Sequence, residues 1–182
     1  MKEKVDVLLS NSAISTRINE LGDKISKDYK NKEIQIICIL KGSVMFMSDL
    51  SKKITVPVYY HFMKVSSYGS GTDSSGVLKV ELDLTESIED KHVLIVEDII
   101  DSGNTLSLLR KLLLERKPAS LKICTLLDKP ERRVVNVPVD YTGFSIPDKF
   151  VVGYGLDFDQ RYRNLDYVGV VSFEEDEEEP FQ

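Results

Sequence analysis

The feature that most constrains the fold of this chain is a run of four branched apolar residues, from Val93 to Val96. Such a run suits a strand that is covered on both faces, which is typical of parallel sheets. A polar break from Asp101 to Gly103 follows, and apolar residues then recur at helical spacing between Thr105 and Arg116. The segment therefore predicts a strand, a tight loop and a helix of an α/β sheet.

The loop between this strand and this helix has the composition of a phosphate site. A helix N-terminus at the carboxyl end of a strand presents free N–H groups that attract anions. Ser102 and Thr105 add hydroxyl groups, and Gly103 permits a positive φ. Glu97 and Asp98 precede the loop, where they can bind the vicinal hydroxyls of a ribose or help to hold Mg²⁺ through water. A ribose 5-phosphate satisfies both ends of the segment.

The rest of the chain alternates between strand and helix patterns. We expect a first helix, capped by Ser10 or Ser12, to end near Tyr29. A second helix should follow a turn at residues 41–43, and residues 66–76, rich in Gly and Ser, should form a mobile loop too long for a routine hairpin turn. This order predicts an α/β fold with a mainly parallel central sheet flanked by helices. The expected strands span residues 34–40, 57–65, 77–82, 92–97 and 120–127.

Length and charge favour a single domain with an acidic tail. A chain of 182 residues that is 42% hydrophobic can bury a substantial core. Its net charge of −6 equals that of six consecutive acidic residues at 174–179, and the 24 acidic residues that remain of 30 balance 24 basic ones. We therefore expect one domain over residues 1–173 and a solvated tail over 174–182. The balanced domain offers no excess of cations for a nucleic-acid backbone.

We also expect a cytoplasmic protein without membrane segments. No apolar run approaches the roughly 20 residues of a membrane span, and no signal-peptide core is evident. Cys38 and Cys124 lie inside apolar runs, so each should be a small buried hydrophobe. His61 and His92 are isolated and should have structural roles.

The string VLIVEDIIDSGNTL, residues 93–106, resembles the phosphoribosyl pyrophosphate (PRPP) motif of purine phosphoribosyltransferases. The resemblance is close to the hypoxanthine-guanine branch and extends over residues 34–171. It implies the type I phosphoribosyltransferase fold, with a small hood built from the N- and C-terminal segments. It also implies transfer of the 5-phosphoribosyl group from PRPP to N9 of hypoxanthine or guanine, giving IMP or GMP and pyrophosphate. Mg²⁺ would be the cofactor, and the protein would be a homodimer or homotetramer.

The resemblance gives each part of this motif a role. Asp101 corresponds to the general base that handles the proton at purine N7, although from the residues alone it could be a helix N-cap. Glu97 and Asp98 correspond to the acidic pair that contacts the ribose and the metal. The 5′-phosphate loop would be Ser102, Gly103, Asn104 and Thr105, and Asn104 stands where some relatives carry Lys.

Two loops would contact the pyrophosphate and cover the reaction. Lys41 and Gly42 match the family's pyrophosphate loop, in which the peptide before the Lys can be cis. Ser67 and Tyr68 match the pair that closes over the reacting centre and excludes water. Read without the resemblance, Lys41 is a solvated loop residue and the Ser-Tyr pair is part of a surface linker.

The C-terminal third would supply the purine and metal contacts. Lys129 would donate to the purine 6-oxo group, which should make adenine a poor substrate. Phe150 would stack on the purine, and Val151 would bind it through its backbone. Asp157 would ligate Mg²⁺ beside the purine, and Arg163 would bind pyrophosphate. Read alone, Lys129 is a solubilising charge, and Phe150 and Val151 are core residues.

Two other functions remain open from the sequence. A PRPP-binding regulator of the same superfamily that acts on nucleic acid would share the phosphate loop. A signalling receiver domain would also use clustered acids to bind Mg²⁺ and accept a phosphate. Lys129, Phe150, Asp157 and Arg163 favour an enzyme over the regulator. The receiver domain gives residues 102–105 no purpose.

Overall fold

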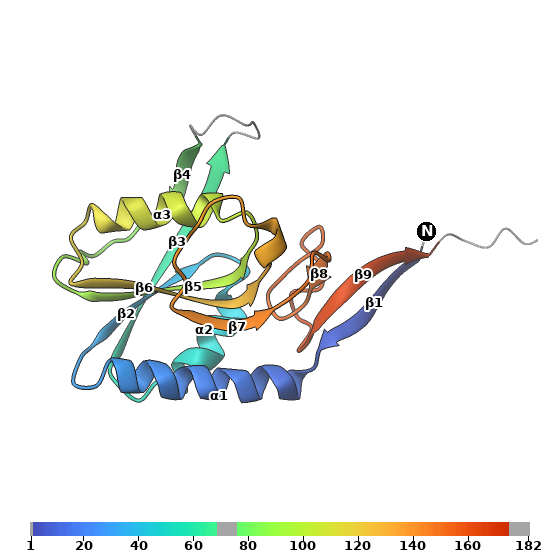
Figure 1. Cartoon of the computed structure of the whole chain (residues 1–182), viewed down its shortest axis with the longest axis horizontal. Helices are drawn as coiled ribbons and strands as arrows, with labels where there is room; N and C mark the ends of the chain where they lie inside the picture. The colour runs from blue at the N-terminus through green and yellow to red at the C-terminus, as the bar shows by residue number, and fades with distance from the viewer. Residues whose placement is uncertain (1, 69–75, 175–182) are drawn as a thin grey trace, which may run out of the picture.

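The structure is a computed structural model that describes residues 2–68 and 76–174 (Figure 1). The described residues form a six-stranded central sheet in the order β4-β3-β2-β5-β6-β7. Neighbouring strands are parallel except for the edge pair β3 and β4, which confirms the predicted mainly parallel sheet. The strands are β2 (Ile34–Ile39), β3 (Val58–Tyr68), β4 (Val77–Leu82), β5 (His92–Ile100), β6 (Ser120–Asp128) and β7 (Tyr141–Ser145).

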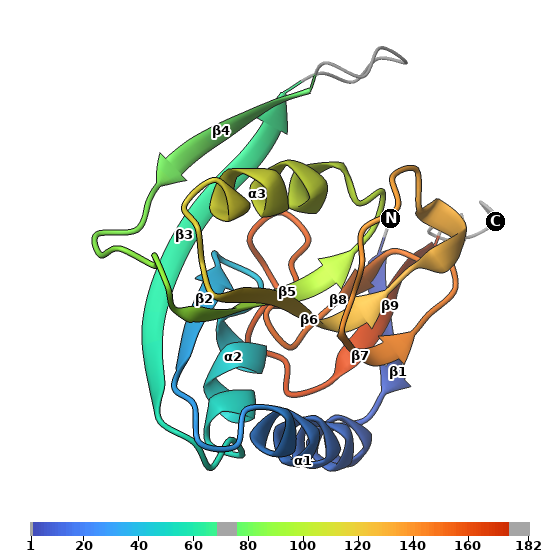
Figure 2. The same cartoon turned by 60° about the vertical axis from the view of Figure 1, so that its left-hand side comes forward.

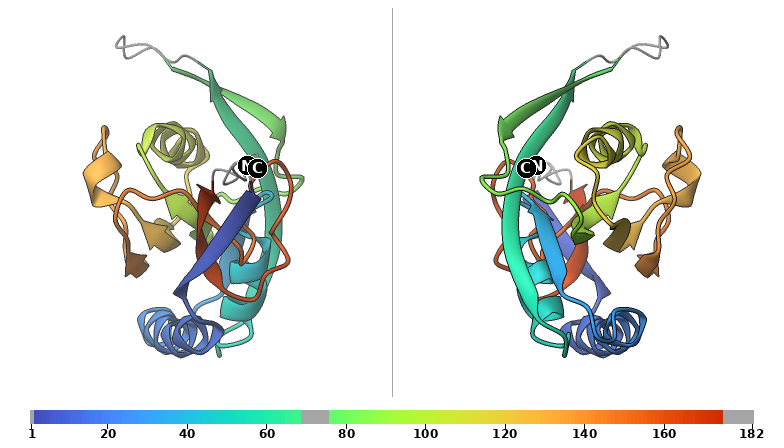
Figure 3. Two further views of the ribbon diagram at one scale, coloured as in Figure 1. Left: turned by 90° about the vertical axis from the view of Figure 1, so that its right-hand side faces the viewer. Right: turned by 90° about the vertical axis from the view of Figure 1, so that its left-hand side faces the viewer.

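Helices cover both faces of this sheet. Seen along the sheet in Figure 3, α1 (Asn11–Asp28) and α2 (Val44–Ser51) lie on one side, and α3 (Asn104–Leu114) lies on the other. Each side has its own apolar core. The run from Val93 to Val96 is fully buried because its side chains alternate between these two cores, as the sequence predicts for a strand covered on both faces.

The first helix confirms its predicted packing face and identifies its cap. Ser10 is the N-cap, and its Oγ accepts a hydrogen bond from the backbone N of Ala13 at 3.2 Å. Four apolar residues at helical spacing are buried beneath the helix: Ile14, Ile18, Leu21 and Ile25. Cys38 and Cys124 are likewise fully buried, as predicted.

The predicted loop over residues 66–76 is wrong in its first part. Residues 66–68 continue strand β3 and pair with β4 in antiparallel register, with Ser67 opposite Leu78 and Tyr68 opposite Val77. The Gly and Ser content predicts a loop, but pairing with β4 satisfies the backbone N–H and C=O groups of residues 66–68 and keeps them in a strand. Figure 2 shows the resulting β3–β4 hairpin projecting beyond the other strands. Residues 69–75 of the predicted loop lie outside the described residues.

A second sheet joins the two ends of the described chain. Its order is β1-β9-β8, with β1 (Lys2–Leu9), β9 (Val168–Glu174) and β8 (Val151–Val152) all paired antiparallel. It lies beside the carboxyl ends of the central strands in Figure 1 and confirms a hood formed from the N- and C-terminal segments. Of the predicted acidic tail, Glu174 belongs to β9, and residues 175–182 lie outside the described residues.

Within the described ranges, none of the helices is both long enough and apolar enough to cross a membrane.

The cap of α1 gives a direct test of the helix boundary. Ser10→Ala should lower the free energy of unfolding by about 1 kcal/mol, because the N–H of Ala13 loses its acceptor. Ser12→Ala is the matched control, since Ser12 lies inside the helix, and it should have a smaller effect. Urea denaturation of both variants measures the difference, and equal losses would contradict Ser10 as the cap.

Candidate active site

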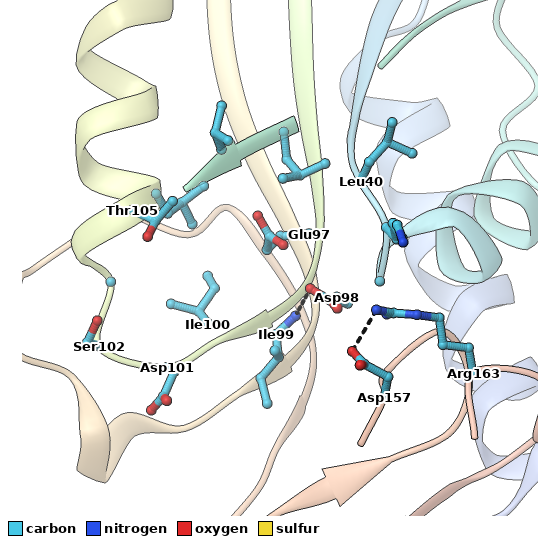
Figure 4. Close-up of a pocket in the computed structure, with 16 residues that line it drawn as sticks. Leu40, Glu97, Asp98, Ile99, Ile100, Asp101, Ser102, Thr105, Asp157 and Arg163 are labelled. Carbon is cyan, nitrogen blue, oxygen red and sulfur yellow. Dashed lines mark hydrogen bonds and ion pairs between the residues drawn. The ribbon is translucent and has the colours of Figure 1, made fainter. Parts of the chain in front are cut away.

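A cavity of about 340 Å³ lies at the carboxyl ends of β2 and β5. Its lining brings together predicted site residues that are more than 100 positions apart in sequence, such as Lys41 and Arg163. Figure 4 shows Asp157 and Arg163 on one side of the cavity and Asp101, Ser102 and Thr105 on the other. The predicted residues in its lining are Lys41, Gly42, Glu97, Asp98, Asp101, Ser102, Gly103, Thr105, Asp157 and Arg163.

Close backbone packing fixes the loop after β2. The peptide between Leu40 and Lys41 is cis, in agreement with the family pattern. Gly42 lies against Asp98, and a Cβ at Gly42 would be 1.6 Å from Asp98 Oδ2. Gly155, with φ of +102°, covers the same loop, and a Cβ there would be 1.9 Å from the carbonyl oxygen of Gly42. Gly155 therefore requires glycine, whereas a side chain at Gly42 would displace the Asp98 carboxylate.

The acidic pair lies inside strand β5, which is three residues longer than predicted. Asp98 Oδ1 accepts a hydrogen bond from the backbone N of Ile99 at 2.9 Å. Burial of the Glu97 carboxyl, together with the negative charge of Asp98, raises the pKa of Glu97 well above its ordinary value. A cationic or hydroxyl-rich ligand that offsets this unfavourable charge would fit the pair.

The carboxylates fit a metal that arrives with a polyphosphate. Among the described residues, no three His, Cys, Asp or Glu side chains are grouped as a metal-binding cluster. Mg²⁺ usually keeps several waters and is held by one or two carboxylates together with substrate phosphates. Asp157, Glu97 and Asp98 line one cavity, and this donor set suits such a shared ion better than an all-protein cage.

The phosphate loop begins α3 without a side-chain cap. Gly103 is the N-cap residue, with φ of +84°, so the positive φ predicted for it is confirmed and the N-cap alternative for Asp101 is wrong. Ser102 Oγ accepts from the backbone N of Asn104 at 3.3 Å. Thr105 Oγ1 donates to Ser67 Oγ at 2.9 Å, which links the loop to the end of β3.

Asp157 and Arg163 form the opposite wall. Arg163 Nη2 is 2.7 Å from Asp157 Oδ1, and Arg163 Nη1 donates to the carbonyl oxygen of Gly155 at 2.7 Å. These bonds hold the guanidinium at the cavity edge beside the loop that carries Lys41, as Figure 4 shows for the ion pair. Lys41 and Arg163, which we call the cationic wall, face the phosphate loop across the cavity.

Three predicted purine contacts lie apart from the lining of this cavity. Lys129 is only 8% exposed and pairs with Asp148 at 3.5 Å, so the reading of a solvated surface charge is wrong. Phe150 is 54% exposed and packs edge-on against Phe158, so the alternative prediction of a core residue is wrong for Phe150. Val151 is buried in the core, in agreement with its core reading. Asn104 and Ser67 are also outside the lining described for the cavity.

Two residues that the sequence did not single out connect Asp101 with Lys129. Arg132 Nε donates to Asp101 Oδ1 at 3.1 Å and lies 3.8 Å from Asp148 Oδ1, which is also the partner of Lys129. The bond to Asp101 raises the pKa of Arg132 above its ordinary value. These contacts join turns that are distant in sequence, and no spacing or motif signals them. We call these four residues the charge chain: Lys129, Asp148, Arg132 and Asp101.

A family model described as phosphoribosyl transferase domain matches residues 4–159. The chain belongs to the phosphoribosyltransferase family. A hypoxanthine phosphoribosyltransferase from Salmonella typhimurium is 55% identical over 173 residues, which cover 94% of this chain and 97% of the relative. A hypoxanthine-guanine phosphoribosyltransferase from Streptococcus pneumoniae is 52% identical over 168 residues, covering 92% of this chain and 93% of the relative.

A solved structure agrees with this membership. The crystal structure of a hypoxanthine phosphoribosyltransferase from Staphylococcus aureus has a TM-score of 0.88 and 50% identity, and the match covers 92% of this chain and 91% of that one. The predicted type I phosphoribosyltransferase fold is confirmed. Membership in the phosphoribosyltransferase family excludes a receiver domain. The three relatives are all named as transferases and give no support to a regulator that acts on nucleic acid.

The contact between the two glycines can be tested by stability. Gly155→Ala should lower the free energy of unfolding by at least about 1 kcal/mol, because the methyl group would meet a backbone oxygen at a residue with positive φ. Thermal denaturation measures the loss. An unchanged melting temperature would show that the loop after β2 can move away from Gly155.

Proposed function

We propose that this protein transfers the 5-phosphoribosyl group of PRPP to N9 of a 6-oxopurine, hypoxanthine or guanine, and so acts in purine salvage. The products would be IMP or GMP and pyrophosphate. The observation that carries the proposal is one cavity with a helix N-terminus, an acidic pair and a cationic wall, in a chain of this family. The names of the relatives from Salmonella typhimurium and Streptococcus pneumoniae support the choice of bases.

The phosphate loop would hold the 5′-phosphate of PRPP. The first turn of α3 offers free backbone N–H groups, and Ser102 and Thr105 add hydroxyl groups. Gly103 would let the backbone approach the phosphate closely. Asn104 would contribute its backbone N–H group but no positive side-chain charge. Within β5, the strand before this loop, Glu97 and Asp98 would accept hydrogen bonds from the ribose hydroxyls.

The charge chain would contact the purine. Asp101 would take the N7 proton while N9 attacks C1 of the ribose and the bond from C1 to pyrophosphate breaks. Lys129 would donate to O6 of the base, where a buried cation favours a 6-oxo group over a 6-amino group. The exposed ring of Phe150 is available for stacking, and the backbone of Val151 would meet the edge of the base.

The cationic wall would receive the leaving pyrophosphate. Lys41, the backbone of Gly42 and the fork of donors on Arg163 would bind its oxygens. Mg²⁺ bound with PRPP would neutralise part of the charge that develops on the leaving group. Asp157 would hold this ion, with Glu97 and Asp98 as further acidic donors. Ser67 and Tyr68, at the end of β3, would close over the reacting atoms and exclude water.

The proposal includes a cytoplasmic homodimer or homotetramer. Both parts rest on the family resemblance, and the oligomeric state can be measured by light scattering coupled to size-exclusion chromatography. A monomer at micromolar concentration would contradict the proposed assembly. Fractionation of the source cells would test the location.

A single assay tests the activity. The protein is mixed with PRPP, Mg²⁺ and one of hypoxanthine, guanine, xanthine or adenine, and nucleotide formation is followed. We expect turnover with hypoxanthine or guanine and poor turnover with adenine. Absence of turnover with every 6-oxopurine would refute the proposed function.

Asp101→Asn should lower kcat by on the order of 10², because an amide cannot accept the N7 proton. Binding of PRPP should be largely preserved, since the phosphate loop and the acidic pair are untouched. Asp90→Asn makes the same change at an exposed residue before β5, away from the cavity, and should leave kcat unchanged. Unchanged turnover in Asp101→Asn would remove Asp101 from the chemistry.

Lys129→Met keeps the length and apolar stem of the side chain but removes its charge. We expect kcat/KM for hypoxanthine to fall on the order of 10²-fold, because the buried donor to O6 is lost. Affinity for PRPP alone, measured by calorimetry, should stay within about twofold, because Lys129 is proposed to contact the purine and not PRPP. An equal loss of PRPP affinity would indicate a general structural role for Lys129.

A further inference from the structure

Gln160 joins the two cations of the proposed pyrophosphate site through one oxygen atom. Its Oε1 accepts from Lys41 Nζ at 3.2 Å and from Arg163 Nη2 at 3.4 Å. Its backbone N donates to Asp157 Oδ2 at 2.8 Å. One residue therefore contacts both cations and the carboxylate that pairs with Arg163, and the sequence offered no motif that marked it.

The amide of Gln160 holds these cations without neutralising them. Arg163 has the carboxylate of Asp157 at 2.7 Å. In residues 2–68 and 76–174, by contrast, Lys41 forms no ion pair, and its side-chain hydrogen bond goes to the neutral oxygen of Gln160. Two cations that converge on one neutral acceptor repel each other and favour the approach of an anion.

The backbone of Gln160 is unfavourable for its residue type. Phe158 and Arg161 exchange two backbone hydrogen bonds, of 3.2 and 3.0 Å, and so close a two-residue hairpin turn. Both central residues have positive φ, +50° at Asp159 and +64° at Gln160. Glycine and Asn are strongly preferred at such positions, because a longer side chain costs conformational energy. A Gln at a position with this strain points to a role for its side chain.

We propose that Gln160 is a positioning residue that orders Lys41 and Arg163 for pyrophosphate and leaves their positive charge available. This inference rests on the proposed function, because it takes the cationic wall as the pyrophosphate site. Incoming pyrophosphate oxygens replace Gln160 Oε1 as the acceptor for both cations. A neutral amide yields to this anion, whereas a carboxylate at the same place would compete with it.

The test is titration calorimetry of the full chain with inorganic pyrophosphate, with and without Mg²⁺. Gln160→Gly should weaken pyrophosphate binding about 3- to 10-fold, because two flexible cations must then be ordered by the ligand itself. Its melting temperature should stay the same or rise, since glycine suits the positive φ. Gln160→Glu should weaken binding by more than about 10-fold through neutralisation of the cations.

Asp159→Gly is the matched control in the same turn. It relieves the neighbouring positive φ but leaves the amide of Gln160 in place, so pyrophosphate affinity should not fall. Binding of IMP without pyrophosphate should be unchanged in Gln160→Gly, which separates a local effect from general damage to the cavity.

The outcomes distinguish this inference from the proposed function. Unchanged pyrophosphate affinity in Gln160→Gly, with normal binding by the unsubstituted protein, would overturn the role of Gln160 and leave the enzyme intact. Equal losses in Gln160→Gly and Asp159→Gly would also overturn it, because the turn and not the amide would then matter. Absence of pyrophosphate binding by the unsubstituted protein would refute the site and the inference together.

Discussion

The parallel pairing of β2 with β5 is the interaction on which the site depends. Cys38 lies opposite Val96 in this pair, so the chain leaves both strands at the same edge of the sheet. The loop of Lys41 and Gly42 thereby meets Asp98, and a side chain at Gly42 would displace the Asp98 carboxylate. A slip of one residue in this register would turn Asp98 to the opposite face and separate the phosphate loop from the cationic wall.

The hood completes the site from the other end of the chain. Asp157 and Arg163 lie between β8 and β9, and Tyr154 in the same segment donates to Asp49 Oδ2 at 2.5 Å, which attaches it to α2. Arg161 pairs with Glu3 of β1 at 2.7 Å. The first strand, although far from Arg163 in sequence, therefore helps to hold the segment that carries Arg163 of the cationic wall.

The sequence predicts those parts of the fold and site that local patterns encode. The apolar run from Val93 to Val96 and the spacing in α1 follow from burial on defined faces, and family motifs identified the charged and hydroxyl-bearing residues that line the cavity. Contacts between distant turns were not predictable. The extension of β3 through Ser67 depends on β4, the bond from Arg132 to Asp101 depends on how two turns meet, and the positive φ of Gln160 has no signature in its residue type.

The charge chain has a thermodynamic consequence. Lys129, Asp148, Arg132 and Asp101 alternate in sign, so the two residues in its middle each face an opposite charge on both sides. Removing one member leaves its neighbours with an excess of one sign, and removing an adjacent pair restores the balance. The effects of substitutions along these residues should therefore not add, and a double-mutant cycle will find coupling energies where separate sites would give none.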